Sequence, residues 1–137
     1  MRLEITRRSD VATRALLFLI ANGKKSKASD VAESVGATSG FLAHAMFALV
    51  QRGWVQSEPG PQGGYWATLD PEAVSVLDVI EAVEGPTDTG RCVLQDRPCS
   101  DKGICSLHVP WSKARADLLN RLSSISLSSL ALEPTRR

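Results

Sequence analysis

The sequence has no apolar run long enough to cross a membrane and no sign of an export signal. Its longest uninterrupted apolar stretch is residues 15–21, whereas a membrane-spanning helix needs about 20 apolar residues. The first residues, MRLEITRRSD, mix acids with bases and lack the apolar core and small-residue cleavage site of a signal peptide. We therefore expect a cytoplasmic protein without a membrane partner.

Combinations of residues that support catalysis are absent as well. The chain contains two histidines, and no Ser-His-Asp set, carboxylate pair or phosphate-binding glycine loop occurs at a useful spacing. Aromatic residues make up 5% of the chain, while a hydrophobic content of 43% is ordinary for a protein with a single core. We predict that the protein is not an enzyme.

A strong excess of one charge is also missing, because the net charge is only +1. The distribution is uneven, however: residues 1–56 contain eight lysines and arginines against four acids, and the remainder is acidic overall. A basic first part fits a surface that faces nucleic-acid phosphates, although a solvated surface with chance asymmetry explains the same pattern.

Five segments have apolar residues at helical spacing, and two short β-prone runs lie among them. The predicted helices cover residues 8–22, 29–35, 38–52, 78–84 with a lead-in from 75, and 110–125. The predicted strands, residues 54–57 and 65–69, flank a turn rich in proline and glycine. This order predicts a mainly α fold with a small β-hairpin wing: a winged helix-turn-helix followed by a long C-terminal helix.

In such a module the start of the third helix contacts bases, the wing approaches the duplex, and nearby arginines contact phosphates. The candidate DNA-binding residues are Arg2, Arg7, Arg8, Ser29, Thr38, Ser39, Gly40, His44, Gln62, Gly63 and Gly64. Simpler explanations exist, since Thr38 can be a helix cap, His44 a surface residue and the glycines part of the hairpin turn. The expected partner is double-stranded DNA, although the same core also occurs in protein-interaction modules.

The predicted C-terminal helix begins at Pro110, because proline suits a first helical position, and residues 126–132 could add a last turn. Its apolar residues lie three and four apart and have no obvious cover in a small domain: Trp111, Ala114, Leu118, Leu119, Leu122 and Ile125. Such a stripe can pack against its mate in a homodimer or fold back on the first helix. A dimer would place two reading helices about one DNA turn apart and predicts a palindromic operator.

All three cysteines, Cys92, Cys99 and Cys105, lie in one polar segment that has little apolar periodicity. Thiolates on a flexible segment can converge on one metal centre, and their spacing lacks the paired knuckles of a zinc ribbon. An iron–sulfur cluster would need a fourth ligand that is not cysteine, and His108 and Asp10 are the candidates. A zinc site with His108, a thiol redox sensor and three inert cysteines are the alternatives.

Several motifs occur in the order that is typical of one family of regulators. They are RRSDVATRALLFL, SDVAESVG, FLAHAMFALVQRGWV and GGYWATLDPEAVSVLDVIEAVEG, followed by the three cysteines and LHVPW. Over nearly its whole length the chain is similar to the regulators related to the iron–sulfur cluster regulator IscR and the nitric-oxide-sensing repressor NsrR. It departs from them in a wing turn, EPGPQGG, that lacks their usual arginine, and in a gap of six residues between the first two cysteines.

The resemblance implies a homodimeric DNA-binding transcription regulator, a repressor, that senses redox state, nitric oxide or iron–sulfur status. It implies that Cys92, Cys99 and Cys105 hold the cluster. The IscR-like pattern completes a 2Fe–2S cluster with a histidine, here His108, and the NsrR-like pattern completes a 4Fe–4S cluster with an aspartate of the other subunit, here Asp10. Because the sequence keeps both residues, both cluster types stay open.

We accordingly expect three parts along the chain. Residues 1–85 would form the DNA-binding domain, residues 86–109 the cluster-binding loop, and residues 110–137 the dimerisation helix and C-terminal tail. The alternative functions are a thiol-redox or zinc-binding regulator without a cluster, and a small redox protein on the same scaffold that does not bind DNA.

Overall fold

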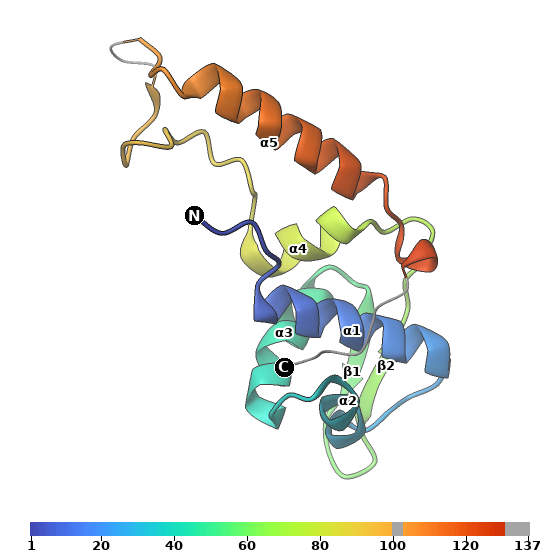
Figure 1. The fold of residues 1–137 in the computed structure, drawn as a ribbon. Coiled ribbons are helices and arrows are strands. Elements are labelled where there is room, and N and C mark those ends of the chain that lie inside the picture. Colours follow the sequence, from blue (N-terminus) through green and yellow to red (C-terminus); the bar gives the residue numbers. More distant parts are fainter. Residues whose placement is uncertain (100–102, 131–137) are drawn as a thin grey trace.

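A computed structural model describes residues 1–99 and 103–130 and confirms the predicted fold class. The elements are α1 (Arg7–Asn22), α2 (Ala28–Val35), α3 (Ser39–Gln51), β1 (Val55–Glu58), β2 (Gly64–Ala67), α4 (Val76–Glu84), α5 (His108–Ser123) and a 3-10 turn (Leu127–Ser129). Helices α1 to α4 and the hairpin form a winged-helix body, from which α5 projects with the cysteine segment at its far end (Figure 1). We call the described part of residues 86–123 the arm.

The helix boundaries follow from local hydrogen bonding. Thr38, one of the two candidates with Ser39, is the N-cap of α3, and its side chain accepts a hydrogen bond from the backbone N–H of Phe41. Ser75 and Asp78 form a reciprocal capping box at the start of α4. Gly36 ends α2 with φ of 66°, a left-handed conformation that favours glycine and allows the tight turn into α3.

All five predicted helix starts differ from the observed starts by one or two residues, and two of them are instructive. Helix α2 begins at Ala28 rather than Ser29. Its N-cap residue is Lys27, whose side chain makes no capping hydrogen bond. Helix α5 begins at His108 rather than Pro110, and Pro110 lies inside its first turn. Backbone N–H groups of the first turn have no partner within the helix, so a proline there removes no hydrogen bond. The end of the predicted last turn (126–132) and the tail (131–137) lie outside the described residues.

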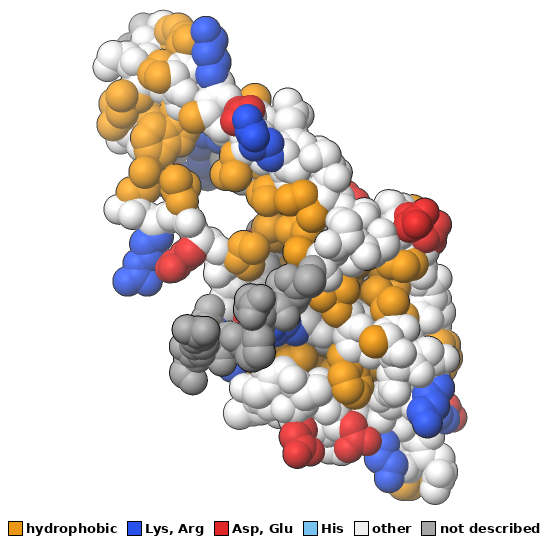
Figure 2. All heavy atoms as spheres, turned by 45° about the vertical axis from the view of Figure 1, so that its right-hand side comes forward, with side chains coloured by type: hydrophobic (Ala, Val, Ile, Leu, Met, Phe, Trp, Pro, Cys, Tyr) orange, Lys and Arg blue, Asp and Glu red, His pale blue; other side chains and the backbone are white. Residues whose placement is uncertain are grey.

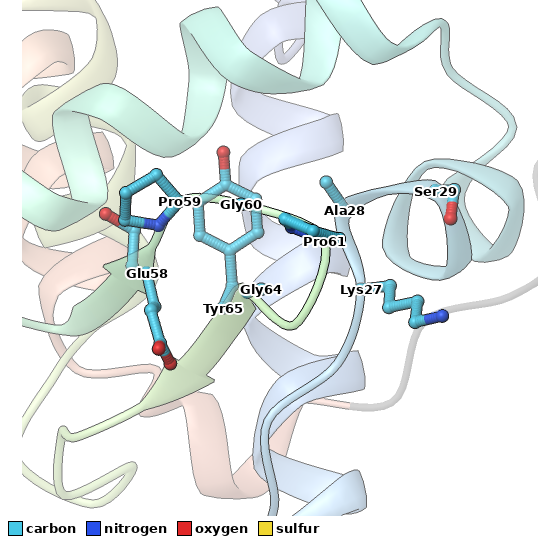
Figure 3. Close-up of a pocket in the computed structure, with 11 residues that line it drawn as sticks. Lys27, Ala28, Ser29, Glu58, Pro59, Gly60, Pro61, Gly64 and Tyr65 are labelled. Atoms are coloured by element: carbon cyan, nitrogen blue, oxygen red, sulfur yellow. The ribbon is translucent and has the colours of Figure 1, made fainter.

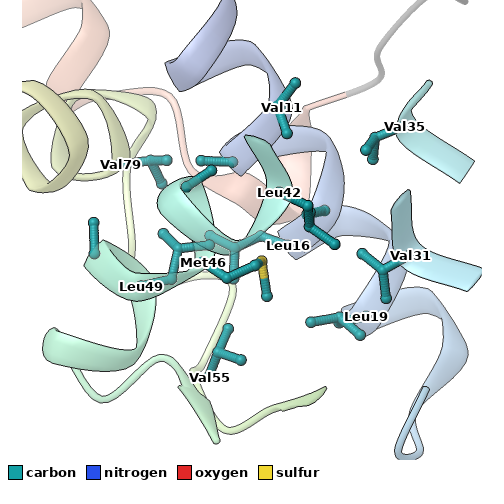
Figure 4. Close-up of a cluster of buried hydrophobic side chains, with 14 of the residues drawn as sticks. Val11, Leu16, Leu19, Val31, Val35, Leu42, Met46, Leu49, Val55 and Val79 are labelled. Atoms are coloured by element: carbon teal, nitrogen blue, oxygen red, sulfur yellow. The ribbon is translucent and has the colours of Figure 1, made fainter. Parts of the chain in front are cut away.

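Helix α1 is the centre of the hydrophobic core, because α2, α3, α4 and β2 all pack against it. Its side chains Val11, Leu16 and Leu19 are fully buried in the core cluster (Figure 4). The other large, fully buried members of this cluster are Val31, Leu42, Met46, Leu49, Val55, Val79 and Leu127. This packing fixes the position of α3 relative to the rest of the body.

The wing is attached to the body through a backbone pairing with the α1–α2 linker. The N–H of Ser26 donates to the carbonyl of Tyr65 and the N–H of Tyr65 donates to the carbonyl of Ser26, both at 2.8 Å. This close approach leaves no room for a side chain at Gly64, where a Cβ would lie 2.2 Å from the Ser26 carbonyl oxygen. An ion pair of 2.8 Å between Lys25 and Glu58 joins the same two segments.

Directly after the arm, the chain returns to the body. The N–H of Val76 donates to the carbonyl of Ile125, and the N–H of Leu127 donates to the carbonyl of Val74, both at 2.9 Å. Leu127 is fully buried in the core, whereas α5 itself has no buried residue and packs against α4. The apolar stripe of α5 therefore stays largely uncovered within one chain.

We predict that Gly64→Ala destabilises the protein by about 2–3 kcal/mol, because the new methyl group overlaps the backbone of Ser26. Gly40→Ala is the matched control, since nothing lies within 4 Å of the place that its new methyl group would occupy. It should keep or raise the stability, because alanine stabilises a helix by up to about 1 kcal/mol relative to glycine. Urea unfolding of the two variants measures the difference. Equal stability of both variants would contradict the close approach.

Candidate metal centre and nucleic-acid interface

The structure brings the three cysteine sulfurs together. The Sγ of Cys105 lies 3.7 Å from that of Cys92 and 3.9 Å from that of Cys99, and all three lie within 4.8 Å of one another. The thiols are free and half-buried. The predicted convergence of the thiols is therefore confirmed, although six and five residues separate them along the chain.

Helix α5 forms the other wall of the cysteine pocket. His108, Trp111 and Arg115 line the same pocket as the three cysteines, together with Asp88 and Arg91 at the start of the cysteine segment. The α5 residues lie three and four positions apart, so they share one face of the helix. His108 was predicted from the sequence and Arg115 was not, although the spacing of Arg115 from His108 is visible in the sequence.

Asp10, the second candidate for a fourth ligand, lies elsewhere in the same chain. It is in the first turn of α1, and its carboxylate accepts a hydrogen bond of 2.8 Å from Arg14 one turn later. It is not among the residues that line the cysteine pocket. Within one subunit His108, and not Asp10, therefore lines the pocket of the thiols, although among the described residues the ligand atoms within 4.8 Å of one another belong to the three cysteines alone.

The three thiols have different environments. The backbone N–H of Leu94 donates to the sulfur of Cys92 at 3.4 Å and, with weaker contributions from the other two thiols, lowers the pKa of Cys92 to about 7. For Cys99, the backbone N–H of Cys105 favours the thiolate. The side chain of Cys92, partial burial and the neighbouring Cys105 outweigh it and raise the pKa of Cys99. Because thiolates are the metal-binding form, Cys92 is more ready than Cys99 to bind a metal.

The donor set suits a metal that prefers sulfur. Three thiolates with one imidazole match the ligand preferences of iron–sulfur clusters and of zinc. The two shortest sulfur separations are close to the ~3.8 Å expected between thiolates on one tetrahedral ion with metal–sulfur bonds of ~2.3 Å. A 2Fe–2S cluster takes two protein ligands on each iron, so two of these sulfurs would share one iron and the third would have to lie further from them than it does here.

The start of α3 presents most of the predicted base-contacting residues to solvent. Thr38, Ser39, Gly40 and His44 are all exposed on the surface of the body. Thr38 also caps the helix, so its hydroxyl already accepts one backbone hydrogen bond. An exposed helix start with small polar residues can enter a major groove, where hydroxyl groups contact several bases or phosphates.

Arg7 has a structural role in addition to its predicted one. Its guanidinium donates a hydrogen bond of 2.9 Å to the Gly36 carbonyl in the turn before α3 and lies 5.6 Å from the centroid of the Phe41 ring. These contacts connect the start of α1 to the start of α3. The other arginines, Arg2 and Arg8, are exposed, and Arg2 pairs with Glu4 at 3.3 Å.

The wing and the start of α2 enclose an open groove (Figure 3). Ser29, Gly63 and Gly64, all predicted DNA-binding residues, line this groove, whereas Gln62 does not line it and is exposed on the turn. The glycines also serve the packing of the hairpin itself, since a Cβ at Gly63 would lie 2.0 Å from the Glu58 carbonyl oxygen. Lys27, which was not predicted from the sequence, is an exposed cation in the same groove.

Known proteins with similar sequence and structure are transcriptional regulators. The model of the family Rrf2, described as iron-dependent transcriptional regulators, matches residues 5–133. The chain is 30% identical over 130 residues to the helix-turn-helix regulator ORF2 of Azotobacter vinelandii (93% of this chain, 79% of the relative). It is 26% identical over 133 residues to the regulator IscR of Aliivibrio salmonicida (96% of this chain, 79% of the relative).

Solved structures share the fold. The structure of T. potens IscR superimposes with a TM-score of 0.73 at 22% identity, over 93% of this chain and 85% of that chain. The relatives are named as regulators rather than enzymes, in agreement with the absence of a catalytic set. Among the described residues, no helix is long and apolar enough to span a membrane.

The pKa shifts predict unequal alkylation of Cys92 and Cys99 in reduced, metal-free protein. The rate at Cys92 should rise with pH through a midpoint of about 7, because its thiolate forms there, while the rate at Cys99 continues to rise at higher pH. Iodoacetamide labelling from pH 5 to 10, with each cysteine quantified by mass spectrometry, provides the measurement. A common pH profile for both thiols would contradict the described environments.

Proposed function

The chain belongs to the Rrf2 family of iron-dependent transcriptional regulators, and from this premise we propose that it represses transcription as a homodimer whose affinity for DNA depends on a bound iron–sulfur cluster. The observation that carries the proposal is the meeting of three thiols beside His108 at the far end of the arm. The signal would be a change of redox state, nitric oxide or the supply of clusters. Each of these acts on iron and sulfur rather than on the protein.

Cys92, Cys99 and Cys105 would hold the cluster, and we propose His108 as the fourth ligand. When bound, the cluster supplies an iron centre that gains or loses electrons and reacts with small oxidants and nitric oxide. His108 is supported over Asp10 because it lines the thiol pocket in the same chain. This choice favours a 2Fe–2S cluster, as in the IscR-like pattern; a 4Fe–4S cluster would instead require Asp10 of the second subunit.

The uncovered stripe of α5 supports the homodimer. Trp111 and Leu118 expose 37% and 43% of their surface, and Val109 and Ile125 are similarly exposed. Apolar side chains gather on the surface of the arm (Figure 2). A helix with apolar residues three and four apart can bury them against the same helix of a second copy, in which case the two α3 helices face one palindromic DNA site.

Helix α1 offers a physical connection between the arm and the DNA-binding surface. The hydroxyl of the buried Ser9 donates a hydrogen bond of 2.7 Å to Glu84, the last residue of α4, directly before the cysteine segment. Two residues earlier, Arg7 holds the turn before α3. A cluster-dependent shift at the base of the arm would therefore reach the start of α3 through one turn of α1.

A regulator that binds a single metal ion is the second candidate, favoured by the short sulfur separations. The three sulfurs already lie at separations that suit one tetrahedral ion, and His108, which lines the same pocket, would have to move closer to supply the fourth ligand. Metal analysis distinguishes the two candidates, because only a cluster contains acid-labile sulfide.

We predict that protein purified without air contains iron and sulfide and protects a symmetric DNA segment of roughly 20–30 base pairs. Removal of the cluster should change the affinity for this segment by up to about 100-fold, or about 2.7 kcal/mol. Cys105→Ser should behave like stripped protein, since Cys105 contacts both other thiols, while the neighbouring exposed Ser106→Ala should behave like wild type. Equal affinity of loaded and stripped protein would refute the regulatory proposal.

The fourth ligand is tested by His108→Ala and Asp10→Asn. We expect His108→Ala to change the visible absorption and Mössbauer spectra and to speed cluster loss, because water or another weak ligand would replace the imidazole. Asp10→Asn should keep the native spectrum. The reverse result would assign Asp10 of the second subunit and a 4Fe–4S cluster, and two unchanged spectra would exclude both residues as ligands.

A further inference from the structure

Arg115 is the most shielded cation on the wall of the cysteine pocket. It lies on the same face of α5 as His108, two turns before it, and Trp111, one turn before it. This face lines the pocket of the three thiols. Only 21% of its side chain is exposed. Arg121, further along the same helix, is 76% exposed and pairs with Asp117 on the outer surface.

Arg115 also holds the start of the cysteine segment. Its guanidinium lies 3.3 Å from the carboxylate of Asp88. Asp88 precedes Arg91 by three residues and Cys92 by four. Arg91 lines the pocket as well, but it pairs with Asp96 and 60% of its side chain is exposed. Among the described residues, the charged groups that line this pocket are Asp88, Arg91 and Arg115, with the imidazole of His108 beside them. The exposed Arg97 lines a neighbouring pocket that shares the three thiols.

A shielded cation at this site affects the relative stability of the oxidised and reduced cluster, because the two states differ in charge. Three thiolates bring three negative charges together, and a one-electron reduction of a bound cluster adds another. A guanidinium keeps its positive charge at every relevant pH, and its effect is screened less when it is withdrawn from solvent. A cation at this position therefore favours the more negative, reduced state.

We propose that Arg115 tunes the reduction potential of the cluster; this proposal rests on the function proposed above. Its charge stabilises the reduced cluster, and its ion pair with Asp88 moderates that effect while holding the segment against α5. Arg115 is a positioning and charge-balancing residue rather than a ligand. Asp88 and Arg115 together would set the potential at which the regulator responds.

The test uses full-length protein loaded with iron and sulfide without air: wild type, Arg115→Gln, Arg115→Lys, Asp88→Asn and the control Arg121→Gln. Iron and sulfide per subunit report loading. Titration with dithionite and redox mediators, followed by visible absorption, reports the one-electron midpoint of each variant.

For Arg115→Gln we expect the ratio of reduced to oxidised cluster at the wild-type midpoint to fall about tenfold, which corresponds to about 59 mV. Arg115→Lys should stay within about threefold of wild type, because the charge is kept. Asp88→Asn should raise the ratio, since a compensating negative charge is lost. Arg121→Gln should leave it unchanged.

Equal midpoints for Arg115→Gln and Arg121→Gln would overturn the proposal. Equal shifts for the glutamine and lysine variants would overturn it too, because shape and not charge would then be responsible. If Arg115→Gln takes up no iron and sulfide, Asp88→Asn provides the test. A ratio of reduced to oxidised cluster that does not rise in Asp88→Asn overturns the proposal. Wild-type protein that takes up neither iron nor sulfide would instead contradict the cluster itself, whereas normal loading with unchanged midpoints contradicts the role of Arg115 alone.

Discussion

The meeting of the three thiols depends on how the cysteine segment is held at its two ends. At its start, the N–H of Thr87 donates to the Glu81 carboxylate of α4 at 2.5 Å, and Asp88 pairs with Arg115 of α5. At its end, the N–H of His108 donates to the carbonyl of Cys105 at 3.1 Å, so the last cysteine leads directly into α5. Because both ends of the segment are attached to packed helices, the segment has fewer accessible conformations. Less conformational entropy is therefore lost when the sulfurs converge.

The arm and the winged-helix body meet where α4 gives way to the cysteine segment. Packing makes α1 the common neighbour of the elements on both sides: it is buried against α2 and α3, and Ser9 bonds the end of α4. A rigid helix that contacts both regions can transmit a displacement only if the packed core has a second arrangement of similar free energy. The uncovered stripe of α5 is the part of the molecule whose surroundings a second subunit would change most.

Fold and signal rest on different residues in this protein. The buried pattern of the body specifies the winged helix, and a similar fold occurs in T. potens IscR at only 22% identity. The sensing that we propose would depend instead on half-buried thiols and their charged neighbours, most of which lie outside the hydrophobic core. Regulators with one fold can therefore differ in ligand set and potential without a change of architecture.

Local spacing in the sequence was enough to predict the five helices, the hairpin and a cap of α3 at Thr38 or Ser39, because each depends on residues a few positions apart. It misplaced every helix start by one or two residues; at α5 the reason is that a proline is acceptable anywhere in a first turn. Only the tertiary structure decided that His108 and Arg115 face the thiols, that Asp10 of the same chain does not, and that Arg7 holds the turn before α3. These facts depend on how helices distant in sequence pack together, and the periodicity of a single helix carries no information about which neighbour its polar face will meet.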